Sequence, residues 1–316
     1  MSENLGQKMR DEIIPKKISS KCCKLAFLSG VIRGAGCLTL ERSGFGFSII
    51  HSNEKLITKC ADIIYVLLRV NPEVTMKDKS HTLSNNFMYE LSLDASDANT
   101  LIKDLYLVDD ESLPMHTIPA AFKTDCCMKS YLRGIFATTG TISIPEQSQH
   151  ASRGYILELL LNDEEMAVAI CELLAECGIE TKVRQRKNVH AVYTKDSEKI
   201  ADFCTILGAS SAYFTLQDIL VFRSIRNETN RSMNCTLANM DRAIKASSKH
   251  VDAIDKIEAS VGLDTLDPVI RETAELRREY PSASLTELAT KFAIPPSKSG
   301  LNHRLRKLLE IAEKLN

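Results

Sequence analysis

Hydrophobic and polar positions along the first two thirds of the chain follow an order that occurs twice. Each time, an apolar helical stretch precedes two strand-like stretches, an acid-capped amphipathic helix, a hairpin-like pair of strands and a final helix. Two such units placed back to back would bury one continuous core, which predicts an α+β fold. The predicted strands are 37–40, 45–51, 141–144 and 155–161, and the predicted helices are 53–68, 96–107, 163–177 and 197–207.

The first helix of each copy shows the duplication most clearly, at a constant offset of 104 residues. Glycine inside a helix costs about 0.5–1 kcal/mol relative to alanine, so Gly30 and Gly134 need a packing reason. We expect the two helices to cross there with their backbones in close contact. Gly36 and Gly140 also suit helix C-termini. The identical positions are Cys22, Cys23, Leu28, Gly30 and Gly36 in the first copy and Cys126, Cys127, Leu132, Gly134 and Gly140 in the second.

The chain has ten cysteines, and no two of them are spaced as Cys-x-x-Cys. This spacing argues against a zinc ribbon or a thioredoxin-like site. Most of the cysteines lie among apolar residues, as Cys171 does, and are expected to be buried thiols. The sequence therefore predicts neither a metal site nor a cofactor.

The repeated helix resembles that of LAGLIDADG homing endonucleases in their single-chain, two-repeat form. In that family the residue before the last glycine is an acid that holds the divalent metal for DNA cleavage. Here the corresponding residues are Ala35 and Thr139, which carry no carboxylate. Glu41 and Glu146 lie beyond the first strand of each copy, at the wrong place to substitute for that acid. The resemblance implies that the fold is kept and that no catalytic residue remains.

Two segments carry candidate phosphate contacts. On the strand that begins near Lys182, alternation places Lys182, Arg184 and Arg186 on one face, as phosphate binding would require. A solvent-exposed edge strand whose cations prevent pairing with another strand would have the same pattern.

The helical connector, 211–262, is expected to contain two helices at about 215–227 and 235–260. Between Arg223 and Lys249 it has six basic residues against two acids. Arg223, Arg226 and Arg231 would contact phosphates there, and a polar linker explains the same composition.

The last part of the chain, 263–316, has clear helix boundaries. Asp267 and Pro268 begin one helix, Ser284 and Glu287 form a capping box before a helix at 285–292, and Ser297 caps the last helix. Three short helices with a tight turn before the third predict a helix-turn-helix, whose last helix enters the major groove. The expected DNA-binding residues are Ser284, Lys298, Ser299, Asn302, His303, Arg304, Arg306 and Lys307. A small helical domain with a solvated basic face is the alternative.

A two-repeat LAGLIDADG-like domain without its acids, followed by a helix-turn-helix, resembles the bacterial WhiA family. The segments 226–231 and 297–307 look like signatures of that family. The predicted organisation is an N-terminal tail (1–20), two repeats (21–110 and 111–210), the connector and the helix-turn-helix. The resemblance implies a non-enzymatic, sequence-specific DNA-binding regulator linked to cell division, chromosome segregation and, in spore formers, sporulation. A nuclease with non-standard metal ligands and an adaptor of the division machinery remain as alternatives.

Composition adds little to this interpretation. Forty basic residues balance 41 acidic ones, so any DNA-binding charge must be segregated by domain. No apolar stretch is long enough to span a membrane, and the N-terminus lacks the apolar segment of a signal peptide. We expect a cytoplasmic, nucleoid-associated protein whose partners are double-stranded DNA and, beyond it, regulatory or division proteins.

Overall fold

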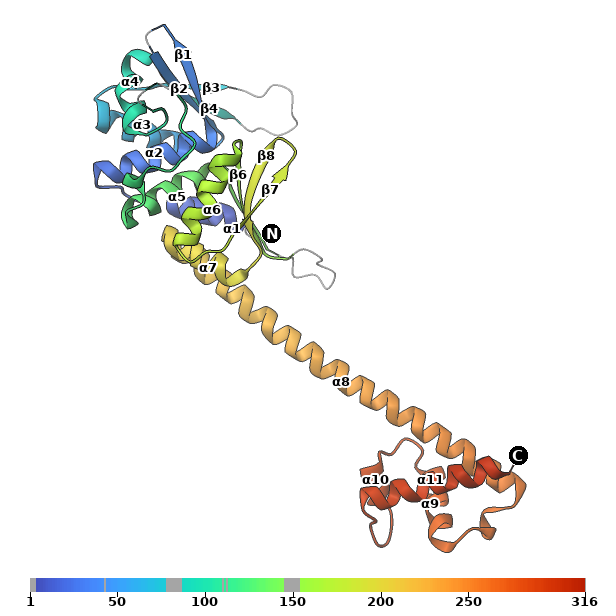
Figure 1. Cartoon of the computed structure of the whole chain (residues 1–316). Coiled ribbons are helices and arrows are strands. Elements are labelled where there is room, and N and C mark those ends of the chain that lie inside the picture. The colour runs from blue at the N-terminus through green and yellow to red at the C-terminus, as the bar shows by residue number, and fades with distance from the viewer. Residues whose placement is uncertain are drawn as a thin grey trace. The chain divides into compact units, whose positions relative to one another are not determined.

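The computed structural model describes residues 4–42, 44–77, 87–109, 111, 113–144 and 154–315. The chain divides into two compact units, Met1–Leu220 and Val221–Asn316. The first unit contains the two predicted repeats, and the second contains only helices among its described residues (Figure 1). The α+β fold class is thereby confirmed.

The first repeat forms an antiparallel four-stranded sheet in the order β1-β2-β4-β3, packed against helices. Alternation along β2 sends Phe47 and Ile49 into the core, where both are fully buried. The elements are α2 (Lys21–Ala35), β1 (Gly36–Glu41), β2 (Gly44–His51), α3 (Glu54–Leu68), β3 (Glu73–Lys77), β4 (Met88–Leu93) and α4 (Ala95–Asp104).

The second repeat builds the same arrangement, with its sheet in the order β5-β6-β8-β7. The predicted order of strands and helices is confirmed in both copies, with shifts of a few residues at the ends. The elements are η1 (Ala120–Phe122), α5 (Asp125–Thr139), β5 (Gly140–Ser143), β6 (Ile156–Leu161), α6 (Glu164–Glu176), β7 (Lys182–Arg186), β8 (Val189–Thr194) and α7 (Ser197–Leu207).

Helices α2 and α5 lie side by side in the middle of the first unit (Figure 1). A Cβ atom on Gly30 would lie 2.3 Å from the carbonyl oxygen of Tyr131, and one on Gly134 would lie 2.3 Å from that of Phe27. No side chain fits at these two points, which confirms the predicted backbone contact. Gly36 and Gly140 have negative φ angles and extended backbone, so they end the helices by starting strands and are not left-handed caps.

The N-terminal segment is not the tail that the sequence predicted. Helix α1 (Leu5–Ile13) is capped by Asn4 and buries Leu5, Met9 and Ile13 in the core of the first unit. These three apolar residues have the i, i+4, i+8 spacing of one helix face, but charged residues between them obscured the pattern in the sequence.

The connector is one continuous helix, α8 (Ser210–Ser260), rather than two helices separated by a break. The amide-rich stretch near residue 230 contains no proline or glycine, so nothing in it interrupts the backbone hydrogen bonds. All residues from 221 to 246 are exposed.

The second unit has its own small hydrophobic core. Leu301, Leu305 and Leu308 of α11 (Lys298–Lys314) belong to this core. Pro268 begins α9 and Asp267 caps it, as predicted. The helix predicted at 285–292 is shorter, because α10 ends at Ala289 and Phe292 packs from the following turn. The elements after α8 are η2 (Leu263–Thr265), α9 (Pro268–Glu279), α10 (Leu285–Ala289) and α11 (Lys298–Lys314).

The described residues include no helix that is both long and apolar enough to cross a lipid bilayer.

Candidate nucleic-acid interface

Helix α11 presents a polar face over its first turns. Its N-terminus is fixed by Ser297, whose hydroxyl oxygen accepts a hydrogen bond from the Gly300 amide at 3.1 Å. Leu301 and Leu305 are fully buried and fix the rotation of the helix. The side chains left on the outer face belong to Lys298, Ser299, Asn302, His303, Arg306 and Lys307, all of which are exposed. The structure thus brings together six of the eight residues predicted to bind DNA. Among these six, Arg306 forms an ion pair with Glu310 of the same helix at 3.6 Å.

The other two predicted residues, Arg304 and Ser284, lie off this exposed face. Arg304 is half-buried, and its guanidinium carbon lies 5.7 Å from the centre of the Phe292 ring. The Ser284 hydroxyl accepts a hydrogen bond from the Glu287 amide at 3.2 Å, while the Glu287 carboxylate accepts one from the Ser284 amide at 2.8 Å. These bonds to Ser284 lower the pKa of Glu287. Ser284 is exposed but already serves as the cap of α10.

Arginines of β7 lie beside an acid that the alternating pattern of this strand did not indicate. Glu158 on β6 has only 11% of its side chain exposed and forms ion pairs with Arg184 and, at 3.7 Å, with Arg186. The Arg184 guanidinium also lies 4.7 Å from the ring centre of Tyr193. Lys182 is exposed on the same face of the strand. Two of the three predicted phosphate contacts on this strand therefore share one carboxylate, which offsets part of their positive charge.

The sheet of the first repeat offers no comparable basic strand among its described residues. Glu73 and Lys77 alternate onto the same face of β3, and Glu90 on the neighbouring strand forms an ion pair with Lys77. In the connector, Arg223, Arg226 and Arg231 are exposed along the middle of α8.

The positions of the missing nuclease acids lie at the ends of α2 and α5. Ala35 is half-buried, and the Thr139 hydroxyl donates to the Ile135 carbonyl at 2.9 Å. Glu41 is exposed at the end of β1, and Glu146 lies outside the described residues. Within the described parts of the chain, Asp, Glu and His side chains form no group of three that could hold a metal ion.

Four cysteines, in contrast, come together although their spacing in the sequence did not predict it. The sulfur atoms of Cys22, Cys23, Cys126 and Cys127 all lie within 4.8 Å of one another. Hydrogen bonds to Ser20 and Cys127 lower the pKa of Cys22 to about 7, whereas burial raises the pKa of Cys127 to about 12. The signal in the sequence was the pair of adjacent cysteines at the same position in both repeats, not a Cys-x-x-Cys spacing.

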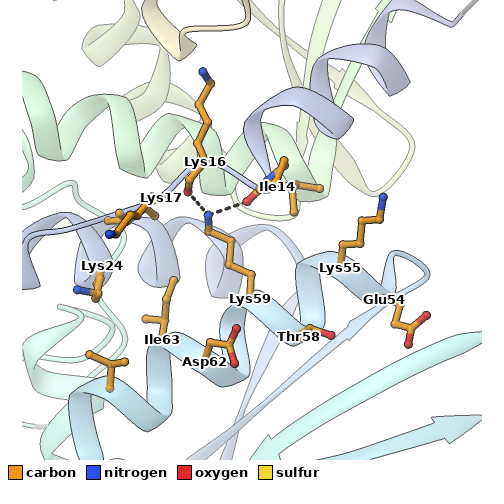
Figure 2. Close-up of a pocket in the computed structure, with 13 residues that line it drawn as sticks. Ile14, Lys16, Lys17, Lys24, Glu54, Lys55, Thr58, Lys59, Asp62 and Ile63 are labelled. Atoms are coloured by element: carbon orange, nitrogen blue, oxygen red, sulfur yellow. Dashed lines mark hydrogen bonds between the residues drawn. The ribbon is translucent and has the colours of Figure 1, made fainter.

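A pocket of about 580 Å³ lies elsewhere in the first unit, and five lysines and two acids contribute to its lining. Lys59 is held inside it, since its ammonium donates to the carbonyl oxygens of Ile14, at 2.6 Å, and Lys16 (Figure 2). Burial lowers the pKa of Lys59. None of the residues predicted to contact DNA lines this pocket.

Comparison with known proteins gives matches along nearly the whole chain. Three family models match in order: the WhiA N-terminal LAGLIDADG-like domain at residues 21–108, the WhiA LAGLIDADG-like domain at 128–226 and the WhiA C-terminal HTH domain at 229–312. The crystal structure of full-length DUF199/WhiA from Thermatoga maritima has a TM-score of 0.58 at 19% identity and covers 100% of this chain and 99% of its own. That likeness shows the fold.

Two relatives carry the name "Probable cell division protein WhiA". The protein from Oceanobacillus iheyensis is 35% identical over 304 residues, which cover 94% of this chain and 93% of the relative. The protein from Clostridium acetobutylicum is 34% identical over 322 residues, which cover 99% and 98%. With these identities over almost full length and the three domain matches in sequence order, the chain belongs to the WhiA family.

Proposed function

We propose that this protein is a non-enzymatic, sequence-specific DNA-binding regulator whose second unit reads base edges through α11. The observation that carries the proposal is the exposed face of the first turns of α11, which bears basic and amide side chains and no acid between Lys298 and Lys307. Arginine and lysine favour guanine edges and asparagine favours adenine in the major groove. The helix that precedes the turn, α10, is capped and packed as a helix-turn-helix requires.

The name of the two relatives supports a role in cell division. We propose that the protein fulfils this role as a transcriptional regulator. It would also act in chromosome segregation and, where the host forms spores, in sporulation. The protein would work in the cytoplasm on the nucleoid. Other regulatory or division proteins would join DNA as partners.

The test begins with a duplex selected from a random library by the full-length protein. Asn302→Ala and Lys298→Ala should each weaken binding to that duplex by about 1–3 kcal/mol if the side chains reach bases, and by less if they reach only phosphates. Lys314→Ala is the matched control, because Lys314 is an exposed cation at the far end of the same helix. Unchanged affinity of both variants would reject α11 as the recognition helix.

The non-enzymatic part of the proposal is tested separately with supercoiled plasmid and Mg²⁺ or Mn²⁺. We expect no nicking, because the positions of the metal-binding acids hold Ala35 and Thr139. Metal-dependent nicking that co-purifies with the protein through successive columns would contradict this part and leave the DNA-reading part standing.

A further inference from the structure

The four clustered cysteines lie where the two repeats meet. Cys22 and Cys23 are the second and third residues of α2, whose N-cap is Ser20, and Cys126 and Cys127 hold the same two places in α5 after Thr124. Because α2 and α5 pack against each other along their length, the starts of the two helices bring both pairs to one point. The cluster is thus a product of the duplication and of the contact at the glycines.

The geometry suits four ligands to one ion. Two neighbouring side chains of a helix normally diverge, yet the sulfur atoms of Cys126 and Cys127 lie 4.0 Å apart. All four sulfurs lie within 4.8 Å of one another. Tetrahedral zinc with bonds of about 2.3 Å to sulfur requires sulfur atoms about 3.8 Å apart. Small rotations of the cysteine side chains would close this difference.

We propose that Cys22, Cys23, Cys126 and Cys127 form a structural zinc site that cross-links the two repeats. Soft thiolate ligands in a set of four favour zinc over harder cations such as Mg²⁺. Cys23 and Cys127 are buried and Cys22 and Cys126 are exposed, so an ion can enter from solvent and still be shielded on one side.

The surroundings favour the negative charge that four thiolates bring. Both pairs lie in the first turn of a helix, where the backbone amides and the helix dipole stabilise anions. The N-termini of α2 and α5 offset part of the net charge of minus two that a zinc ion with four thiolates would carry.

A disulfide explains the arrangement less well. One disulfide uses two sulfurs and gives no reason for the other two to converge. Within either pair, the two cysteines are neighbours in a regular helix, where a bond of about 2.05 Å between sulfurs would distort the backbone. A single tetrahedral ion employs all four.

The experiment uses the full-length protein purified under reducing conditions from cells supplied with zinc. We expect about one zinc per chain by elemental analysis, as for other sites with four cysteine ligands. After chelation, Co²⁺ should produce the visible bands of tetrahedral cobalt and a near-ultraviolet thiolate charge-transfer band. Cys22→Ser with Cys126→Ser should abolish both signals, whereas Cys235→Ser, at an exposed cysteine of α8, should retain them.

Three results would overturn the proposal: wild-type protein without stoichiometric zinc and without the cobalt bands, a folded double variant that still binds zinc, or a disulfide among the four cysteines in the purified protein. If the double variant does not fold, Cys22→His decides the matter, because histidine can replace a thiolate ligand and should preserve zinc binding. None of these measurements depends on DNA binding, so they test the zinc site independently of the proposed role of α11.

Discussion

At the scale of single residues, the contact between α2 and α5 depends on two missing side chains. Gly30→Ala should destabilise the first unit by about 1–3 kcal/mol, because its Cβ would lie 2.3 Å from a backbone carbonyl and neither helix can move without disturbing the core. Gly134→Ala should have a similar effect. Gly154→Ala is the control, since no atom of the described part of the chain lies within 4 Å of a Cβ added there. Urea unfolding of the full chain measures these differences, and equal stabilities for Gly30→Ala and the control would contradict the close contact.

His250 gives the second unit a dependence on pH. Burial lowers its pKa, the charge of Arg277 lowers it further, and its Nδ1 has no hydrogen-bond partner among the residues that the structure describes. The unfolded chain therefore binds a proton near pH 6.5 that the folded chain takes up only at lower pH. Stability should fall as the pH drops below about 6.5 and level off below the folded-state pKa.

The measurement for His250 is urea unfolding of wild type and His250→Gln between pH 7.5 and 5. The variant should lose part of the pH dependence. His51→Gln is the matched comparison, because burial also lowers the pKa of His51 but this residue lies in the first unit. An unaltered pH profile for His250→Gln would mean that His250 does not titrate differently in the two states.

Residues whose role depends on near neighbours in sequence could be predicted, and those that depend on distant ones could not. The caps at Asp267, Ser284 and Ser297 are local hydrogen bonds, and all three are present. The pairing of Glu158 with Arg184 joins two strands, so alternation along β7 alone could not reveal it. The cysteine cluster was hidden for the same reason.

At the scale of secondary structure, the middle of α8 has an unusual environment. Every residue from 221 to 246 is exposed, whereas Leu216 and Ile254 near the two ends are fully buried. Helices gain most of their stability from packing, so this stretch should open more readily than the ends. Hydrogen exchange followed by mass spectrometry should show faster exchange at 221–246. Uniformly slow exchange would contradict this and would mean that another surface covers exposed apolar side chains such as Phe222 and Met233.

A strong hydrophobic period made most elements predictable. The period is weak in α1 and in α8, and the predictions of an N-terminal tail and of a two-helix connector were wrong there. Helix α1 carries polar residues between Leu5, Met9 and Ile13, so the sequence alone did not reveal its buried face. In α8, amides and arginines weaken the apolar pattern without ending the helix. Both errors concern elements whose length or environment local pattern does not determine.

At the scale of the whole molecule, a net charge of −1 conceals an uneven distribution. The basic strand of the second repeat is partly neutralised by Glu158, and Lys77 in the first repeat is paired with Glu90. The start of α11 has no acid at all. If DNA binding follows unpaired positive charge, the second unit should supply most of the phosphate contacts.

This distribution can be measured by the salt dependence of DNA binding by the full chain. Removing one cation that neutralises a phosphate should reduce the slope of log K against log salt by about 0.9. Lys298→Gln with Lys307→Gln should reduce it by about 2, because both lysines are exposed at the start of α11. Arg184→Gln with Arg186→Gln is the control in the first unit and should leave the slope nearly unchanged, since both arginines already pair with Glu158. The opposite result, a reduced slope for the β7 variant and an unchanged slope for the α11 variant, would place the DNA on the sheet of the second repeat.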